Sequence, residues 1–152
     1  MKNTLPAFSA PPDIIKPGPN QGIDTDVKPD IKIRNAMEDP LRIDFLYYAE
    51  SKYINGGWVQ IQAQTYVRPV GSDMRYRLLQ AINIPIAPSK HYFKSHRDML
   101  FYSLLFPRLP EDVTHIDIIE CEGPGGNWFN FYGVSMETIR NGIIPVNLKR
   151  NI

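Results

Sequence analysis

From about residue 31 onward, the chain consists of short segments in which apolar and polar residues alternate, separated by glycine and proline turns. Residues 41–45 alternate in this way, and the Asn-Gly-Gly at residues 55–57 then breaks the pattern as a hairpin turn would. A two-residue repeat matches a strand, whose successive side chains point to opposite faces, and does not match the roughly 3.6-residue repeat of a helix. The chain is therefore expected to fold mainly into short strands.

Strand signals of this kind occur in seven segments: residues 41–48, 58–64, 76–86, 99–106, 115–119, 128–132 and 143–148. Residues 99–106 are almost continuously apolar, which predicts a strand buried on both faces. In residues 58–64, the side chains of Val59, Ile61 and Ala63 are predicted to share one face. Ser135 can cap a short helical turn that ends near residues 141–142.

Short strands with turns between them predict an all-β fold of seven to eight strands. The expected architecture is an immunoglobulin-like antiparallel β-sandwich, and a small barrel is the alternative. A chain of 152 residues is long enough to bury the core of one such domain. The side chains expected in this core are Ile43, Phe45, Val59, Ile61, Leu78, Ile82, Phe101, Ile116, Ile118 and Phe131.

The first thirty residues hold six of the fourteen prolines of the chain. Because proline fixes φ and removes a backbone donor, this stretch predicts an extended arm and not a sheet. The chain is therefore divided into a proline-rich extended arm at residues 1–30 and a β-sandwich domain at residues 31–152. Ile14, Ile15 and Ile23 are candidate partner-binding anchors within the arm, and a simple tail is the alternative.

Deleting residues 1–30 is expected to leave the sandwich folded and to abolish assembly with a partner. Each isoleucine that the partner buries would contribute roughly 1.5–3 kcal/mol of transfer energy, so replacing Ile14 and Ile15 by serine should have nearly the same effect. Melting temperature and sedimentation of both variants check this prediction. Loss of the cooperative melt would assign the arm to the domain's own core, and unchanged assembly would make it only a tail.

Charge is balanced over the whole chain but not along it. Seventeen basic and sixteen acidic residues leave a net charge of +1. We therefore expect neither binding to nucleic acid nor insertion into a membrane. Residues 68–108 hold seven basic and two acidic residues, whereas residues 111–122 hold five acidic residues and no basic one. Arg75, Arg77 and Arg97 of the basic part are candidate partner-binding residues. Neutralisation between adjacent strands is the alternative.

Residues that could carry chemistry form no recognisable catalytic or metal-binding pattern. Cys121 is the single cysteine, and the glutamates on both sides of it disfavour a thiolate. His91 and His96 have the wrong spacing for two zinc ligands on one helix face. Asp117 and Glu120 have opposite strand parity, so Glu120 is expected to accept hydrogen bonds from backbone or arginine donors. A protein without enzymatic activity, cofactor or metal is therefore expected.

Three groups of short motifs follow one another in a fixed order. They are W-V-Q-I and T-Y-V-R at residues 58–61 and 65–68, F-P-R-L-P and I-D-I-I-E at residues 106–110 and 116–120, and N-F-Y-G-V at residues 130–134. Over about residues 41–136 this order resembles a family of uncharacterised bacterial immunoglobulin-like β-sandwich domains, although the family's proline pair is spaced F-x-P-L-P. The resemblance implies a sandwich that is often appended to other domains in exported proteins, and it brings no catalytic residue.

The function predicted from these features is that of a non-enzymatic interaction or structural module. It would be a subunit of a larger assembly, tethered through its N-terminal arm to other protein subunits of the same or a different kind. The alternative is a glycan- or small-molecule-binding module of an envelope-associated protein, which would use aromatic side chains such as Trp58, Tyr66 and Trp128. Since no secretory leader is recognisable, a cytoplasmic location is expected, or an envelope-associated one if a leader was removed.

Overall fold

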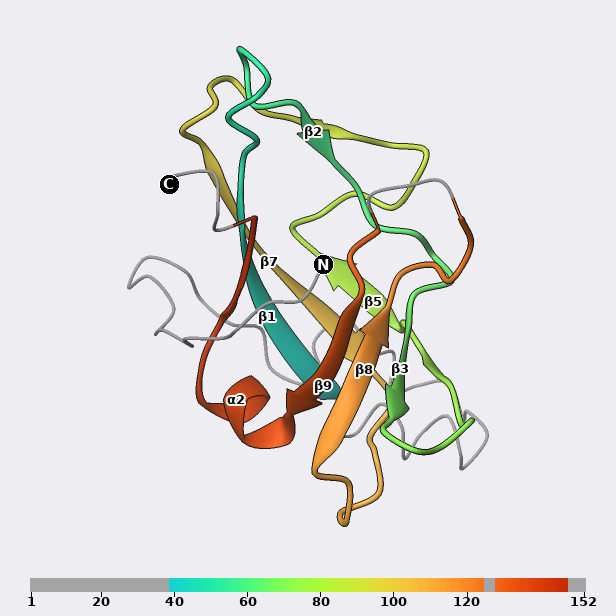
Figure 1. The fold of residues 1–152 in the computed structure, drawn as a ribbon. Helices are drawn as coiled ribbons and strands as arrows, with labels where there is room; N and C mark the ends of the chain where they lie inside the picture. The colour runs from blue at the N-terminus through green and yellow to red at the C-terminus, as the bar shows by residue number, and fades with distance from the viewer. Residues whose placement is uncertain (1–38, 125–127, 148–152) are drawn as a thin grey trace, which may run out of the picture.

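The structure, a computed structural model, describes residues 39–124 and 128–147 and consists mainly of short β-strands (Figure 1). Its elements are β1 (Leu41–Tyr48), β2 (Trp58–Val59), β3 (Tyr66–Pro69), β4 (Tyr76–Arg77), β5 (Gln80–Ile82), β6 (His91–Tyr92), β7 (Met99–Phe106), β8 (His115–Ile119), β9 (Phe131–Ser135), α2 (Met136–Asn141) and β10 (Ile144–Val146). The predicted all-β class is confirmed. The ten strands of the described residues exceed the seven to eight expected, and the predicted arm and its boundary at residue 30 lie outside them.

The described strands form two four-stranded sheets and one two-stranded sheet. The first sheet has the order β10-β1-β7-β5, the second has the order β4-β3-β8-β9, and β2 pairs only with β6. Strands β1 and β7 pair antiparallel along their full length, whereas β10 runs parallel to β1. The first sheet is therefore mixed and not purely antiparallel as expected, because α2 carries the chain from β9 back to the first sheet before β10 begins.

Residues 76–86 do not form the single strand that the alternation predicts. Strand β4 pairs with β3 in the second sheet, whereas β5 pairs with β7 in the first. The chain changes sheet between Leu78 and Leu79. The N–H of Leu78 donates to the carbonyl of Thr65, just before β3, whereas the N–H of Leu79 donates to the carbonyl of Leu105 on β7. Apolar alternation continues through the crossing, since a segment between two sheets still turns side chains toward their shared core. Leu78 and Ile82 are half-buried there and not fully in the core.

Two other predicted strands are shorter than expected. Residues 58–64 are a strand only over β2, after which Ile61 makes a single bridge to Ile86. Both the N–H and the hydroxyl of Thr65 donate to the carbonyl of Gln62, which closes a turn and leaves Ala63 exposed. The predicted strand at residues 128–132 begins only at Phe131.

Strand β7 is buried over all but its first residue, as its apolar run predicts. Strand β1 was expected to be half-buried but is buried on both faces. Its central acid Asp44 accepts hydrogen bonds from the Ser103 hydroxyl at 2.6 Å and from the Arg42 guanidinium at 2.9 Å. A polar residue within an alternating strand can thus be buried when such donors satisfy it. The predicted cap is also present, since the Ser135 hydroxyl accepts from the first turn of α2.

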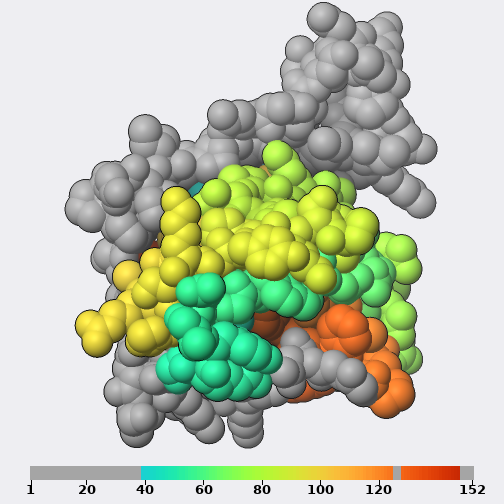
Figure 2. Space-filling view, turned by 90° about the horizontal axis from the view of Figure 1, so that it is seen from above, coloured from blue at the N-terminus to red at the C-terminus, as the bar shows by residue number. Residues whose placement is uncertain are grey.

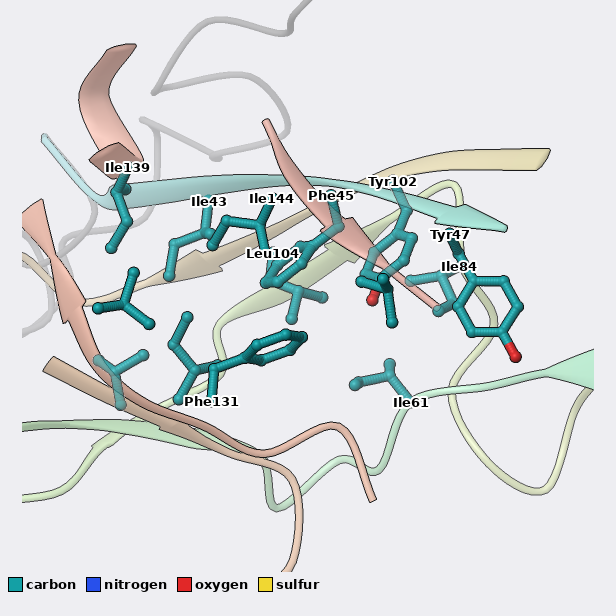
Figure 3. Close-up of a cluster of buried hydrophobic side chains, with 14 of the residues drawn as sticks. Ile43, Phe45, Tyr47, Ile61, Ile84, Tyr102, Leu104, Phe131, Ile139 and Ile144 are labelled. Carbon is teal, nitrogen blue, oxygen red and sulfur yellow. The ribbon is translucent and has the colours of Figure 1, made fainter. Parts of the chain in front are cut away.

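Side chains from both four-stranded sheets meet in one hydrophobic core (Figure 3). The ring of Phe45 on β1 stacks on that of Tyr102 on β7, with 5.0 Å between centroids, and lies 5.9 Å from the ring of Phe131 on β9. Eight of the ten predicted core residues are buried: Ile43, Phe45, Val59, Ile61, Phe101, Ile116, Ile118 and Phe131. Phe101 belongs to a second, smaller cluster with Leu46 and Ile143.

Candidate functional site

A cleft of about 1280 Å³ opens at the end of the molecule that carries the β2–β6 pair. Its walls come from the loop between β1 and β2, from β2 and the residues after it, from β6, and from Glu120, Trp128 and Phe129, which lie between β8 and β9 in the chain. The space-filling view shows the surface hollowed between the teal-to-green segment of the β1–β2 loop and β2 and the orange segment after β8 (Figure 2). Segments that are far apart in the sequence therefore enclose one space.

Aromatic side chains line much of this cleft: Tyr47, Tyr53, Trp58, Tyr92, Phe93, Trp128 and Phe129. The inner rings are held by one another. Tyr47 stacks on Phe93 with 5.5 Å between centroids, and the edge of Phe129 meets Tyr47 at the same distance. The residues Tyr53, Trp58 and Tyr92 are 51%, 46% and 66% exposed. The cleft thus has a packed aromatic interior and an exposed aromatic rim.

A buried carboxylate connects two walls of the cleft. Glu120 is 3% exposed, and its Oε2 accepts from the N–H of Gln62 at 3.1 Å while its Oε1 accepts from the N–H of Phe129 at 2.9 Å. Burial raises the pKa of Glu120 above its ordinary value, and the two backbone donors limit that rise by favouring the charged form. The prediction that Glu120 accepts from backbone donors is confirmed.

Asn130 holds the backbone next to this carboxylate, and no pattern in the sequence identifies it. Its side-chain oxygen accepts from the N–H groups of Glu120 and Cys121 at 2.8 and 3.3 Å, and its Nδ2 donates to the Cys121 carbonyl at 2.7 Å. The contacts of this asparagine could not be predicted from its neighbours in the sequence, because its hydrogen-bond partners lie nine or ten residues away.

At another wall, the carboxylate of Glu50 accepts from the side-chain amide of Asn147 at 3.2 Å and lies 3.7 Å from the ammonium group of Lys52. The pKa of Tyr47 is raised, chiefly by burial and further by the negative charge of Glu50. The Tyr47 hydroxyl therefore stays protonated and neutral inside the cleft.

The β1–β2 loop that carries the rim depends on glycine at one position. Gly56 has φ of +81°, and a Cβ there would lie 2.6 Å from the Ser95 carbonyl oxygen and 2.7 Å from the Ala49 side chain. Only glycine fits both the left-handed backbone and this close approach. The predicted break at residues 55–57 is present and sets the path of the chain into Trp58. It does not close a hairpin, because β1 pairs with β7 and β10 whereas β2 pairs only with β6.

The structure places the oppositely charged segments against each other. Arg68 of β3 pairs with Asp117, its neighbour on β8, at 3.2 Å. Glu122 contacts the guanidinium groups of both Arg68 and Arg75 at 3.1 Å. These contacts favour neutralisation between strands for this part of the surface.

The candidate partner-binding arginines come from two separate segments, Arg75 and Arg77 at β4 and Arg97 in the loop between β6 and β7. Arg75 is engaged by Glu122, Arg77 is exposed on β4, and Arg97 is exposed in the loop between β6 and β7. The candidate arm residues Ile14, Ile15 and Ile23 lie outside the described residues. Partner binding by these six residues stays a prediction.

Of the three aromatic candidates, Trp58 and Trp128 line the cleft. Tyr66 does not belong to it, because its side chain is buried on β3 with the Arg75 guanidinium 4.7 Å from its ring centroid. Within residues 39–124 and 128–147, no group of three or more histidine, cysteine or carboxylate side chains is placed to hold a metal ion.

In the same described ranges, no helix has the length and hydropathy needed to cross a membrane. Comparisons with protein-family models, with curated proteins and with solved structures found no match to this chain. The resemblance to bacterial immunoglobulin-like domains therefore stays a prediction from its short motifs.

Proposed function

We propose that this chain is a non-enzymatic binding module that holds an organic ligand in the cleft beside the β2–β6 pair. The observation that carries the proposal is the convergence of exposed aromatic rings and hydrogen-bonding side chains around one hollow. Ligand sites are typically concave and lined by apolar and aromatic groups, with a few polar groups that orient the ligand. Exposed aromatic surface gathered at one place is also costly in water unless it serves binding.

The walls of the cleft support this proposal because they are held before any ligand arrives. Glu120 joins the backbones of Gln62 and Phe129, and the Tyr47 and Phe93 rings stack on each other. A site that needs little reorganisation loses less conformational entropy on binding.

Binding without catalysis is favoured by the chemistry of the lining side chains. Those that the structure describes include no serine, threonine, cysteine or histidine. Both oxygens of Glu120 already accept backbone hydrogen bonds, and Glu50 is engaged by Asn147 and Lys52. A general acid or base needs a free position next to the atom that it protonates or deprotonates.

The assembly subunit that the sequence predicts is kept as a second proposal. It is supported by Val70 and Met74, two exposed apolar side chains on the β3–β4 connection, close in sequence to the exposed Arg77. Methionine and arginine are enriched in protein interfaces. We also propose an immunoglobulin-like sandwich as the finer description of the fold, supported by two four-stranded sheets that share one core.

Tryptophan fluorescence tests the binding proposal, because both tryptophans of the chain, Trp58 and Trp128, line the cleft. A library of sugars, nucleosides, amino acids and aromatic cations at millimolar concentration is expected to contain compounds that change the emission of the full chain. Trp58→Ala should weaken the binding of these compounds at least tenfold, because it removes an exposed aromatic side chain of the cleft. Tyr132→Ala removes a similarly exposed ring on β9, outside the cleft, and should leave affinity unchanged. A library without a binder, or binders insensitive to Trp58→Ala, would contradict the proposal.

A further inference from the structure

The charged side chains that line the cleft, among the described residues, are Glu50, Glu120 and Lys52. Each of them is already engaged, and both oxygens of Glu120 accept backbone hydrogen bonds. The Lys52 ammonium lies 3.7 Å from Glu50, and that of Lys90 lies 4.3 Å from the centroid of the Trp58 ring. Since each of these lining charges already has a partner within the protein, the cleft offers none of them to an anionic or a cationic ligand.

Two of the rim rings form a pair across the small sheet. Trp58 on β2 and Tyr92 on β6 are directly opposite each other in the antiparallel register. Side chains at opposite positions of such a pair project from the same face, with Cβ atoms about 4.5–5.5 Å apart. Both residues line the cleft and are 46% and 66% exposed, so two aromatic side chains stand next to each other at its rim. We call this pair the Trp58–Tyr92 platform.

Two buried polar atoms among the cleft residues have no hydrogen-bond partner in the described structure. They are the Oε1 acceptor of Gln60 and the Nε1–H donor of Trp128. Buried polar groups are nearly always paired, because an unpaired one keeps its desolvation penalty. A hydroxyl group can donate to an amide oxygen and also accept from an indole N–H. Because both atoms are buried, a ligand hydroxyl reaches them only when the Gln60 or Trp128 side chain turns toward the cleft.

Together, the geometry points to a neutral oligosaccharide of at least two sugar units as the ligand of this cleft. This inference rests on the proposed function and narrows it to one chemical class. The C–H face of a sugar ring packs against an aromatic face, so the Trp58–Tyr92 platform accommodates two consecutive units. The amide groups of Gln60 and Gln62 match sugar hydroxyls, which both donate and accept. A volume of about 1280 Å³ exceeds the roughly 300–1,000 Å³ of most small-ligand pockets and suits an extended ligand.

The test uses the full chain and oligosaccharides of one to six units. The neutral series are built from glucose, mannose, galactose or N-acetylglucosamine, and galacturonate and glucosamine oligomers serve as matched anionic and cationic series. At least one neutral series is expected to bind by tryptophan fluorescence and calorimetry, with affinity rising at least tenfold from one unit to two. Tyr92→Ala should remove most of that gain in affinity. Gln60→Leu should lower the affinity for oligosaccharides of every length. Tyr132→Ala is the control and should bind like the wild type.

Each remaining outcome decides the matter. Absence of binding to every neutral series at millimolar concentration, preference for a charged series, or affinity independent of Tyr92 overturns the inference. If a nucleoside, amino acid or aromatic cation binds the cleft in a Trp58-dependent way and no saccharide does, this inference fails and the proposed function stands. If no compound changes the emission of either tryptophan, both fail. A melting temperature close to that of the wild type excludes misfolding of Tyr92→Ala, whose side chain is largely exposed.

Discussion

Replacing Phe45 by alanine is expected to lower the free energy of unfolding by about 3–5 kcal/mol, the range for truncating a fully buried phenylalanine. Phe45 is 1% exposed, stacks on Tyr102 within the first sheet and contacts Phe131 of the second. The loss combines transfer of the ring to water with a cavity between the two sheets, which neither sheet can close alone. Ile61→Ala, at another fully buried position, is expected to cost about 2–5 kcal/mol for the same reason.

Urea unfolding followed by circular dichroism measures both losses in the full chain. The matched control is Tyr132→Ala, which removes an aromatic ring that is half-exposed on β9 and should change the unfolding free energy by about 0.5 kcal/mol or less. A loss below about 1 kcal/mol for Phe45→Ala would contradict a core shared by the two sheets. A far-UV spectrum dominated by helix would contradict the all-β architecture itself.

Glu120→Ala is expected to destabilise the chain by about 2–4 kcal/mol at neutral pH. The substitution leaves the N–H groups of Gln62 and Phe129 without their acceptor, and each buried unpaired donor costs about 1–3 kcal/mol. Removing a buried charge returns part of this cost. Because Phe129 adjoins Trp128 in the chain, the emission of Trp128 should also change in this variant. Unfolding free energy and emission both equal to the wild type would contradict the role of Glu120 in joining two cleft walls.

The pH dependence of stability provides an independent measurement of the same carboxyl group. The pKa of Glu120 is raised in the folded chain, so this state binds the proton more tightly than the unfolded state does. The part of the stability that arises from this pKa shift is therefore complete below the unfolded pKa and is lost as pH rises through the folded pKa, whereas the hydrogen bonds to Gln62 and Phe129 remain. In Glu120→Gln this slope should be absent, so the unfolding free energy of the wild type falls relative to that of the variant as pH rises above the ordinary glutamate pKa of about 4.3. Parallel pH profiles would contradict a raised pKa.

Much of the local structure could be predicted from the sequence. Three features depend only on residues close in the sequence and could therefore be predicted. They are the apolar run at residues 99–106, the cap at Ser135 and the glycine break at residues 55–57. Strand alternation also predicted that Asp117 and Glu120 would not share a face. In the structure Asp117 pairs with Arg68, whereas Glu120 accepts from two backbone N–H groups. Of the cleft, the sequence identified Trp58 and Trp128 only as candidate aromatics, without indicating that they line one hollow.

The sequence by itself therefore determined the strand-rich class, the positions of β1, β7 and β8, and most of the buried core side chains. Only the tertiary structure decided which sheet each strand joins, that residues 76–86 cross between sheets, and that β10 lies parallel to β1. It also decided the cleft, where Glu120 connects Gln62 and Phe129 and Asn130 holds the backbone at Glu120. The physical reason is that alternation records whether a side chain faces the core or water, whereas pairing depends on which distant segment satisfies its backbone groups.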